Sequence, residues 1–298
     1  MNILEVLKRS TEFLAKRGVA SPRLQVELLL AHLLKMPRMN LYLNFERVLT
    51  AAETEALRDA VRRRGQREPL QYIVGSVSFC GLELTVNPHV LVPRPETELL
   101  AEHAWKFLQQ RTSGAPLRAL DLCTGSGCLA LALLANAPRA EADATDISAD
   151  ALQVARQNAA RLQVLPRIQF HLGDGFAAVP ADRRFDLIVS NPPYIPTAEI
   201  ETLEPEVRDH EPRGALDGGS DGLDFYRRIA AQAGAFLRPG GRLMLELNDH
   251  GAEPVREIFA RENWTVESVE VDYNQHPRIF IAHQAGQLQD GAARIDGA

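Results

Sequence analysis

The chain has 298 residues, of which 45% are hydrophobic and 24% are charged. This composition is that of an ordinary globular protein and excludes a disordered chain, and the net charge of −6 argues against a protein that coats nucleic acid. No apolar run reaches the roughly 18 residues that span a bilayer, and the N-terminus lacks the apolar segment of a signal peptide. We therefore expect a cytoplasmic protein. A monomer is also expected, although no feature of the sequence gives the oligomeric state. The three cysteines give no disulfide framework, and no His/Cys cluster has zinc-ligand spacing, so no metal is expected.

Residues 1–75 are predicted to form a small helical bundle. Ser21 is expected to cap a helix that begins at Pro22, and Thr50 with Glu53 has the pattern of a capping box. The stretch holds 13 lysines and arginines against 8 acidic residues, which indicates either a solvated helical surface or a face for an acidic or phosphate-bearing partner. A first amphipathic helix is predicted from apolar residues near i, i+3 and i+4 spacing: Ile3, Val6, Leu7, Phe13 and Leu14.

The pattern changes after residue 75. Residues 76–92 alternate in a way that predicts two short strands around Cys80 and Gly81, a hairpin linker. From residue 93 onward, strand-like and helix-like segments alternate, which predicts an α/β domain with a doubly wound, mostly parallel sheet. The predicted strands are 117–122, 140–145, 168–172, 186–190, 242–247 and 278–282, and the predicted helices are 129–135, 149–162, 225–237 and 254–262. Residues 285–298 are expected to be a disordered tail.

A glycine-containing loop follows the first strand of this sheet and precedes a helix. Gly125 and Gly127 allow a tight turn and close approach to a ligand, and an open α/β sheet binds ligands beyond the carboxyl ends of its strands. The loop has neither the dinucleotide fingerprint nor the lysine of a phosphate loop, and a turn without a ligand is the alternative. The predicted cofactor residues of the loop are Cys123, Thr124, Gly125, Ser126 and Gly127.

Acidic residues end the next two strands. Asp146 follows the glycines by about 20 residues, where a carboxylate can accept hydrogen bonds from both ribose hydroxyls. Its alternative role is the cap of the following helix, which Ser148 could provide instead. Asp174 could accept a hydrogen bond from an adenine amino group beside Gly175, with Phe176 as an apolar wall, or it could be a simple turn residue.

The fourth predicted strand ends in Asn191-Pro192-Pro193-Tyr194. A residue before proline is held extended, so Asn191 is expected to be rigid at the strand end, facing the same crevice as the glycine loop. Its side-chain oxygen and the Pro192 carbonyl could accept both N–H bonds of a planar –NH2 group, on which Tyr194 could stack. Such a nitrogen needs orientation and electrostatic support rather than a triad or a metal. We therefore assign catalytic roles to Asn191, Pro192 and Tyr194, with Pro193 as a substrate contact and Asn191 also as a cofactor contact.

At these residues the chain resembles the protein release factor glutamine methyltransferases, which methylate the glutamine of the Gly-Gly-Gln motif in class I peptide-chain release factors. The resemblance covers about residues 1–283 and includes the segments 21–24, 27–32, 67–73, 92–98, 191–195, 211–212 and 221–223. It implies a helical bundle (1–75) that engages the release factor, a hairpin linker (76–92) and a Rossmann-like methyltransferase domain (93–284). It also implies S-adenosylmethionine as cofactor, held by residues 123–127 and Asp146, with the substrate glutamine at residues 191–194.

Three positions depart from the family pattern. The family usually has glycine at Cys123, often a large apolar or aromatic residue at Gly175, and a more glycine-rich segment at 246–250. Cys123 and Cys128 are also similar to a sister family that methylates a glutamine of a large-subunit ribosomal protein. The role of segment 94–98 is open between a helix start and, by the resemblance, a cofactor contact through Thr97.

DNA adenine-N6 methyltransferases share the Asn-Pro-Pro-Tyr motif, because a flipped adenine presents a similar –NH2 group. They need a basic groove for the nucleic acid, whereas here the residues beyond the bundle are acidic overall. A binding scaffold without activity is a further alternative, against which the presence of both Asn191 and Asp146 argues.

Overall fold

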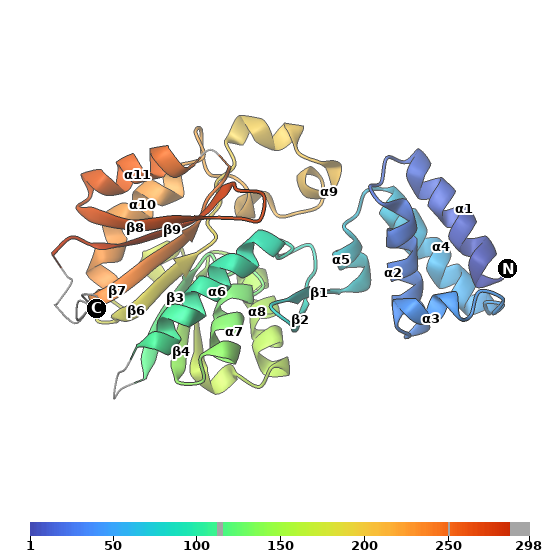
Figure 1. The fold of residues 1–298 in the computed structure, drawn as a ribbon, viewed down its shortest axis with the longest axis horizontal. Helices are drawn as coiled ribbons and strands as arrows, with labels where there is room; N and C mark the ends of the chain where they lie inside the picture. Colours follow the sequence, from blue (N-terminus) through green and yellow to red (C-terminus); the bar gives the residue numbers. More distant parts are fainter. Residues whose placement is uncertain (112–115, 250, 287–298) are drawn as a thin grey trace, which may run out of the picture. The chain divides into compact units, whose positions relative to one another are not determined.

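A computed structural model describes residues 1–111, 116–249 and 251–286, which form two compact units (Figure 1). The helical unit comprises residues 1–76, 86–88 and 203–211, and the sheet unit comprises 77–85, 89–202 and the residues from 212 onward. The tail predicted to be disordered is 285–298. Its residues from 287 on lie outside the described part of the chain. In the described residues, no helix is long and apolar enough to cross a membrane.

Six helices form the helical unit within the described residues: α1 (Ile3–Lys16), α2 (Pro22–Leu34), α3 (Arg38–Tyr42), α4 (Ala51–Gly65), α5 (Leu70–Val74) and α9 (Pro205–Arg208). The predicted capping box is confirmed at α4, where Thr50 and Glu53 exchange backbone-to-side-chain hydrogen bonds of 2.8 and 3.2 Å. Pro22 begins α2 as predicted, but the cap prediction for Ser21 is wrong. Its φ of +47° turns the backbone into the left-handed region, and its side chain makes no capping bond.

The core of the helical unit is apolar and is lined by the residues that the periodicity of α1 predicts, including Ile3, Val6 and Leu14. One carboxylate, Glu27, is buried with them and accepts hydrogen bonds from Tyr42 (2.7 Å) and Arg23 (3.0 Å). Burial opposes the ionisation of Glu27, but these hydrogen bonds outweigh it and lower its pKa. A buried charge is tolerated because it is fully paired.

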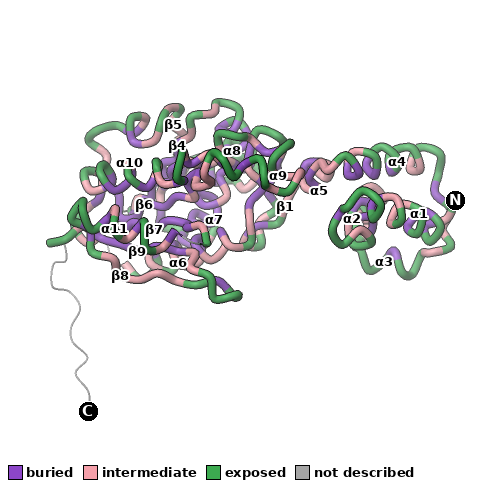
Figure 2. The backbone as a smooth tube through the Cα atoms, turned by 90° about the horizontal axis from the view of Figure 1, so that it is seen from above, coloured by how far each residue is buried: buried purple, intermediate pink, exposed green. Residues whose placement is uncertain are grey.

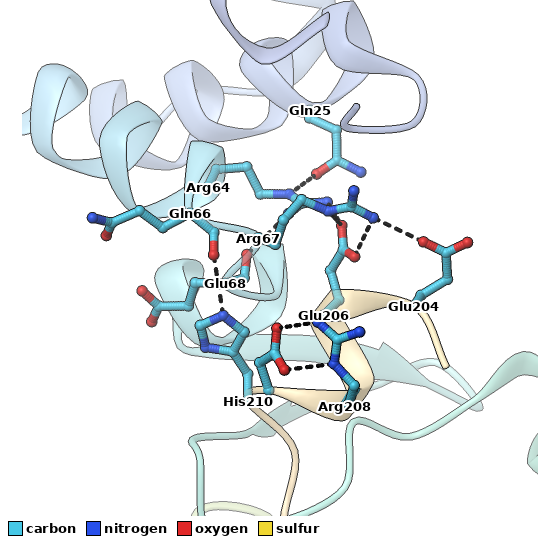
Figure 3. A network of polar contacts seen from close by, with 10 residues as sticks. Gln25, Arg64, Gln66, Arg67, Glu68, Glu204, Glu206, Arg208 and His210 are labelled. Atoms are coloured by element: carbon cyan, nitrogen blue, oxygen red, sulfur yellow. Dashed lines mark hydrogen bonds and ion pairs between the residues drawn. The ribbon is translucent and has the colours of Figure 1, made fainter. Parts of the chain in front are cut away.

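The short helix α9 belongs to the helical unit although it lies far along the chain from the others. Glu206 accepts a hydrogen bond from Arg64 at 2.6 Å and another from Arg67 at 2.7 Å, and Arg67 also bonds Glu204 at 2.9 Å. Figure 3 shows both arginines of the α4 end converging on Glu206, with His210 reaching the Gln66 carbonyl (3.2 Å). These contacts hold residues 203–211 onto the helices of the N-terminal segment.

We expect Glu206→Ala to lower the free energy of unfolding by about 2 kcal/mol, the scale for hydrogen bonds to charged groups. Its side chain is 18% exposed, whereas that of Glu204 is 77% exposed. Glu204→Ala is therefore the matched control and should change stability by about 0.5 kcal/mol or less. Urea unfolding followed by circular dichroism measures both.

The pH dependence of the same pair of variants provides a second measurement. Burial disfavours the charge on Glu206, but hydrogen bonds from Arg67 and Arg64 win and lower its pKa. A lowered carboxyl pKa contributes stability above the unfolded-state pKa and loses it as pH falls through the folded-state pKa. The gap between wild type and Glu206→Ala should therefore narrow in acid. A gap that is constant with pH would argue against the ionised clamp.

A seven-stranded sheet forms the centre of the sheet unit, in the order β5-β4-β3-β6-β7-β9-β8. The first five of these strands are parallel, β9 pairs with β7 in the antiparallel direction, and β8 pairs antiparallel with β9. A separate hairpin pairs two strands at the predicted linker. The bounds are β1 (Ser76–Phe79), β2 (Leu82–Thr85), β3 (Leu117–Leu122), β4 (Ala140–Asp146), β5 (Ile168–Leu172), β6 (Phe185–Ser190), β7 (Leu237–Glu246), β8 (Trp264–Val271) and β9 (Pro277–Gln284).

Helices cover both faces of the sheet, as the predicted strand–helix alternation requires (Figure 1). One face packs against α6 (Pro95–Gln110), α7 (Cys128–Asn136) and α8 (Ala149–Arg161), and the other against α10 (Asp224–Gln232) and α11 (Ala252–Arg261). The parallel strand β6 is buried along its whole length (Figure 2). The predicted α/β class with a mostly parallel, doubly wound sheet is thus confirmed.

Candidate active site

The strand order places one reversal point at the centre of the sheet. From β3 the chain adds β4 and β5 on one side, then returns to add β6 and β7 on the other. Ligands of open α/β sheets bind beyond the carboxyl ends of the strands at such a reversal. A cavity of about 170 Å³ opens there. Its wall includes seven of the residues that the sequence predicts for cofactor or substrate: Cys123, Gly125, Asp146, Asp174, Gly175, Asn191 and Pro193.

The glycine loop between β3 and α7 has a backbone that few side chains tolerate. Gly125 and Gly127 have φ values of +54° and +84°. A Cβ on Gly127 would lie 3.2 Å from the side chains of both Ala155 and Leu131, whereas one on Gly125 would meet open space. Cys123 also has a positive φ, +59°, a conformation that costs a non-glycine residue about 1–2 kcal/mol. Glycine, which the resemblance gives as usual at this position, would adopt this conformation without that cost.

Asp121 accepts hydrogen bonds from the glycine loop and from the helix that follows it. This role of Asp121 was not predicted from the sequence. Its Oδ2 accepts hydrogen bonds from the Thr124 hydroxyl (2.6 Å) and from the Ala130 backbone N–H (3.1 Å). Its Oδ1 is buried without a hydrogen-bond partner in the described residues. Burial raises the pKa of Asp121 to about 7. The signal that could have found it is a carboxylate at the end of a buried strand, directly before the glycines.

Asp146 ties the end of β4 to the glycine loop. Its Oδ2 accepts the Gly125 N–H and its Oδ1 accepts the Ser148 N–H, both at 2.9 Å. Ser148, not Asp146, caps α8, because its hydroxyl accepts the Ala151 N–H at 3.1 Å. Each carboxylate oxygen has two lone pairs, so both retain an acceptor for a hydroxyl in the cavity. Burial raises the pKa of Asp146.

The apolar wall of the cavity comes from a different element than predicted. Phe176 is buried and stacks on Phe236 with ring centroids 5.0 Å apart. It does not border this cavity, but it lines a smaller hollow that shares Gly175 and Phe225 with it. Phe225, at the start of α10, lines the cavity itself. Arg228 lies over the Phe225 ring at 5.0 Å and bonds Asp174 at 2.6 Å. Asp174 therefore lies at the cavity already paired with a cation.

Asn191 connects the cavity to a buried polar network. Its Nδ2 donates to Thr97 Oγ1 at 3.2 Å, and the Thr97 hydroxyl donates to Glu246 Oε2 at 2.6 Å. The Tyr194 hydroxyl donates to the other oxygen of Glu246 at 3.2 Å. Burial raises the pKa of Glu246 to about 7 and that of the Tyr194 phenol further above its usual value. From the sequence, the role of segment 94–98 is open between a helix start and, by the resemblance, a cofactor contact through Thr97, and no role is predicted for Glu246.

The remaining predicted residues lie around the cavity rather than in its described wall. Thr124 and Ser126 are buried in the glycine loop. Pro192 is buried beside Asn191, and Tyr194 packs partly against the core under α10. The predicted site thus gathers at one place, and the structure separates the residues that border the cavity from those that support them.

The residues of the cavity fit S-adenosylmethionine. Asp146 offers two acceptors for ribose hydroxyls, Phe225 offers an apolar surface for a flat base, and Gly125 leaves room for close backbone approach. This combination of an acidic pair of acceptors, an apolar wall and a glycine turn is the one that adenosine ligands use at such sheets.

Known proteins are similar to this chain along nearly all of its length. Residues 5–75 match the family model described as PrmC N-terminal domain, and residues 96–203 match the one described as methyltransferase small domain. The release factor glutamine methyltransferase of Geobacter sulfurreducens is 47% identical over 87% of this chain and 88% of its own. That of Chlorobaculum tepidum is 45% identical over 93% of this chain and 95% of its own.

Solved structures agree on the fold. Human methyltransferase 10 domain containing protein superimposes with a TM-score of 0.51 at 17% identity, over 68% of this chain and 88% of that one. The sequence relatives and family models confirm the predicted enzyme class, a methyltransferase that uses S-adenosylmethionine. From the identity and the coverage of these relatives it follows that the chain belongs to the release factor glutamine methyltransferase family.

Proposed function

We propose that this protein transfers a methyl group from S-adenosylmethionine to the side-chain amide nitrogen (N5) of the glutamine in the Gly-Gly-Gln motif of class I release factors. One observation supports this most strongly. Asn191, with an amide that can accept N–H bonds, borders the same cavity as Asp146 and Gly125. A nitrogen held by Asn191 would therefore lie within the cavity that fits the methyl donor.

The cofactor role falls to the wall residues. S-adenosylmethionine, when bound, supplies a methyl carbon on a positively charged sulfur. Asp146 would accept the ribose hydroxyls, Gly125 would let the backbone approach the ligand, and Phe225 would cover the base. The roles predicted for Cys123, Thr124, Ser126, Gly127, Asp174 and Gly175 belong to the same proposal, as neighbours or supports of these contacts.

The acceptor role falls to the residues after β6. An amide nitrogen is a weak nucleophile because its lone pair is delocalised into its carbonyl group. The Asn191 Oδ1 and the Pro192 carbonyl would hold both N–H bonds of the glutamine –NH2, which favours a nitrogen whose lone pair points at the methyl group. The rate gain then comes from alignment and placed acceptors. Pro193 would border the substrate, and Tyr194 would support the segment.

The direct test uses the full chain, S-adenosylmethionine with a labelled methyl group, and a purified class I release factor. We expect label on the glutamine of Gly-Gly-Gln, located by peptide mass spectrometry, and none on a release factor with that glutamine replaced by alanine. Parallel reactions contain large-subunit ribosomal proteins or adenine-containing DNA. Label on either of these, with the release factor unlabelled, would overturn the proposal.

The helical unit is the proposed docking surface for the release factor. Its helices α2 and α3 pack together and leave several large apolar side chains exposed. Large apolar side chains that are exposed to solvent are candidates for burial against a protein partner. Leu43, which follows α3, is 82% exposed, and Met39 in α3 is 65% exposed. The others are Leu24, Leu28 and Tyr42.

We therefore expect Leu43→Asp and Met39→Asp each to raise KM for the release factor by about 10-fold, because removing an apolar side chain from an interface costs about 1–2 kcal/mol. The kcat should stay unchanged, since neither residue belongs to the sheet unit that contains the cavity. Tyr273→Asp is the matched control, because Tyr273 is a large exposed side chain of the sheet unit. Steady-state kinetics with intact release factor measure all three. An equal KM in the three variants would exclude Leu43 and Met39 from the docking surface for the release factor.

A further inference from the structure

The hydroxyl of Thr97 lies between a carboxylate and an amide, a placement that neither the family resemblance nor the glycine-loop motif assigns. Thr97 is in the first turn of α6 and is 1% exposed, and Glu246 at the end of β7 is 2% exposed. The hydroxyl is 2.6 Å from Glu246 Oε2 and 3.2 Å from Asn191 Nδ2. Three elements that are distant in sequence thus meet at one oxygen atom.

The hydrogen count at this oxygen fixes the direction of both bonds. A hydroxyl carries one hydrogen and two lone pairs, and an ionised carboxylate can only accept. The Thr97 hydrogen therefore goes to Glu246, and the Thr97 oxygen is left as an acceptor. Only the nitrogen side of the Asn191 amide can donate to it. The Asn191 Oδ1, on the other branch of the amide, is then left for the cavity.

We propose that Thr97 and Glu246 are positioning residues that set the orientation of the Asn191 amide, so that its oxygen and not its nitrogen faces the acceptor –NH2 group. The inference rests on the proposed function for the identity of that acceptor. Without the pair, the two ends of an amide differ little in shape, and the reversed amide would present N–H groups to a substrate that has N–H groups of its own.

Glu246 also holds the other end of the same segment. Its Oε1 accepts the Tyr194 hydroxyl at 3.2 Å, so a single carboxylate is joined to both Asn191, through Thr97, and Tyr194. The Glu246 backbone carbonyl accepts the buried Tyr226 hydroxyl at 2.8 Å, which holds β7 at this point. Because two prolines lie between Asn191 and Tyr194, the segment has little freedom once both ends are held.

Protonation of Glu246 would reverse this arrangement. A protonated carboxyl can donate to Thr97, which frees the Thr97 hydrogen to point at Asn191 and lets the amide turn over. Burial raises the pKa of Glu246 to about 7, opposed by the Thr97 and Tyr194 hydroxyls and by Arg278 of β9, and assisted by Glu96 of α6. Tyr226 of α10 and Cys128 of α7 also face this carboxylate. We expect kcat to rise with pH through this range as Glu246 ionises.

The first experiment compares Thr97→Val with Thr97→Ser. Valine keeps the size of threonine but removes the hydroxyl, and serine keeps the hydroxyl. We expect kcat of Thr97→Val to fall by about 30-fold or more, because misalignment at a reacting group costs about that much. The kcat of Thr97→Ser should remain within about 3-fold of wild type, because serine keeps the hydroxyl and with it the alignment. The KM for S-adenosylmethionine should be unchanged in both variants. An equal kcat in the two variants would overturn the inference.

The second experiment uses Glu246→Gln, which cannot ionise. We expect the rise of kcat near neutral pH to be present in wild type and absent in this variant. Asp143→Asn is the matched control for removal of a buried charge, because Asp143 is also a buried carboxylate, paired with His171 at 2.6 Å and outside the wall of the cavity. It should keep the wild-type pH profile. A Glu246→Gln profile that still rises in the same range would assign the rise to another group and overturn the role of Glu246.

A measurement on the free protein separates this inference from the proposed function. In 15N-labelled full-length protein, the side-chain NH2 signal of Asn191, identified as the one that disappears in Asn191→Asp, should exchange slowly with water in wild type and quickly in Thr97→Val. This outcome does not depend on any methyl acceptor. If no release factor is methylated but the amide is protected, the proposed function fails and the positioning pair stands. If the release factor is methylated but the amide is unprotected, the proposed function stands and the positioning pair fails.

Discussion

Asn191→Ala is expected to lower kcat by about 100-fold or more, the cost of removing one placed group that acts on the transition state. The variant loses the oxygen that would hold the glutamine N–H, while Asp146 and Phe225 would keep the proposed cofactor contacts. The dissociation constant for S-adenosylmethionine should therefore stay within about 3-fold of wild type. A change of this size corresponds to less free energy than one typical hydrogen bond contributes. Single-turnover methylation and calorimetry measure the two quantities separately.

Asn136→Ala is the control for this variant. Asn136 ends α7 and uses its Nδ2 to bond the Ala132 carbonyl at 2.9 Å, away from the cavity. It should retain wild-type kcat. If Asn191→Ala loses as much cofactor affinity as turnover, Asn191 holds the cofactor rather than the acceptor, and the assignment of roles in the cavity must be exchanged.

Asp146→Asn is expected to weaken S-adenosylmethionine binding by about 2 kcal/mol, which corresponds to about 30-fold in Kd. In wild type the two carboxylate oxygens accept the backbone N–H groups of Gly125 and Ser148 and retain acceptor capacity for the ligand. An asparagine has one NH2 that cannot accept, so either Gly125 or Ser148 loses its acceptor and the ribose loses one as well. Calorimetry with the full chain measures the change.

Two further observations sharpen this prediction. Asp150→Asn removes an exposed carboxylate from the first turn of the same helix, α8, and should leave Kd unchanged. Because burial raises the pKa of Asp146, the ionised form that accepts hydroxyl hydrogens is lost as pH falls through this raised pKa. Affinity should therefore decrease in mild acid in wild type and stay flat in Asp146→Asn. A flat wild-type profile would count against a ribose contact at Asp146.

The meeting of the glycine loop with Asp146 was predictable because it depends on local sequence. A glycine turn directly after a buried strand, and a carboxylate at the end of the next strand, must lie together in a parallel sheet. The position of Asn191 followed from the same rule. The partners of these residues did not follow, because Thr97 and Glu246 are joined only by the tertiary fold. No spacing rule connects a helix start with the end of a strand that comes 149 positions later.

The outcomes at Ser21 and Phe176 both depend on the direction of a side chain. Ser21 does not cap its helix, and Phe176 does not border the cavity that Asp146 and Asn191 line. Phe176 lies in a short 3-10 turn (Gly175–Ala178) that points its ring at Phe236, which leaves the cavity wall to Phe225. Ser21 precedes a helix as expected, but a left-handed backbone turns its hydroxyl away from the first turn. Side-chain direction depends on φ and ψ, which composition does not reveal.

Strand β8 is absent from the predicted set for another reason. Its sequence, WTVESVEV, mixes acidic and apolar residues, and it lies at the edge of the sheet beside β9. An edge strand has only one neighbour and does not need the continuous apolar run that marks a buried parallel strand. The strands with such runs, β3 and β6, have the bounds that their sequences predict to within one residue.

The detour of the chain through α9 means that the helical unit is not a contiguous cassette of the gene. Its last piece, residues 203–211, is encoded between the Asn-Pro-Pro-Tyr segment and the cavity residues Pro212, Gly214 and Ala215. Cutting the protein at residue 76, or exchanging the part before it, would therefore separate Glu206 from its partners Arg64 and Arg67. Recombination between relatives would keep these contacts only where residues 1–76 and 203–211 come from the same parent. The two segments are therefore expected to be inherited together.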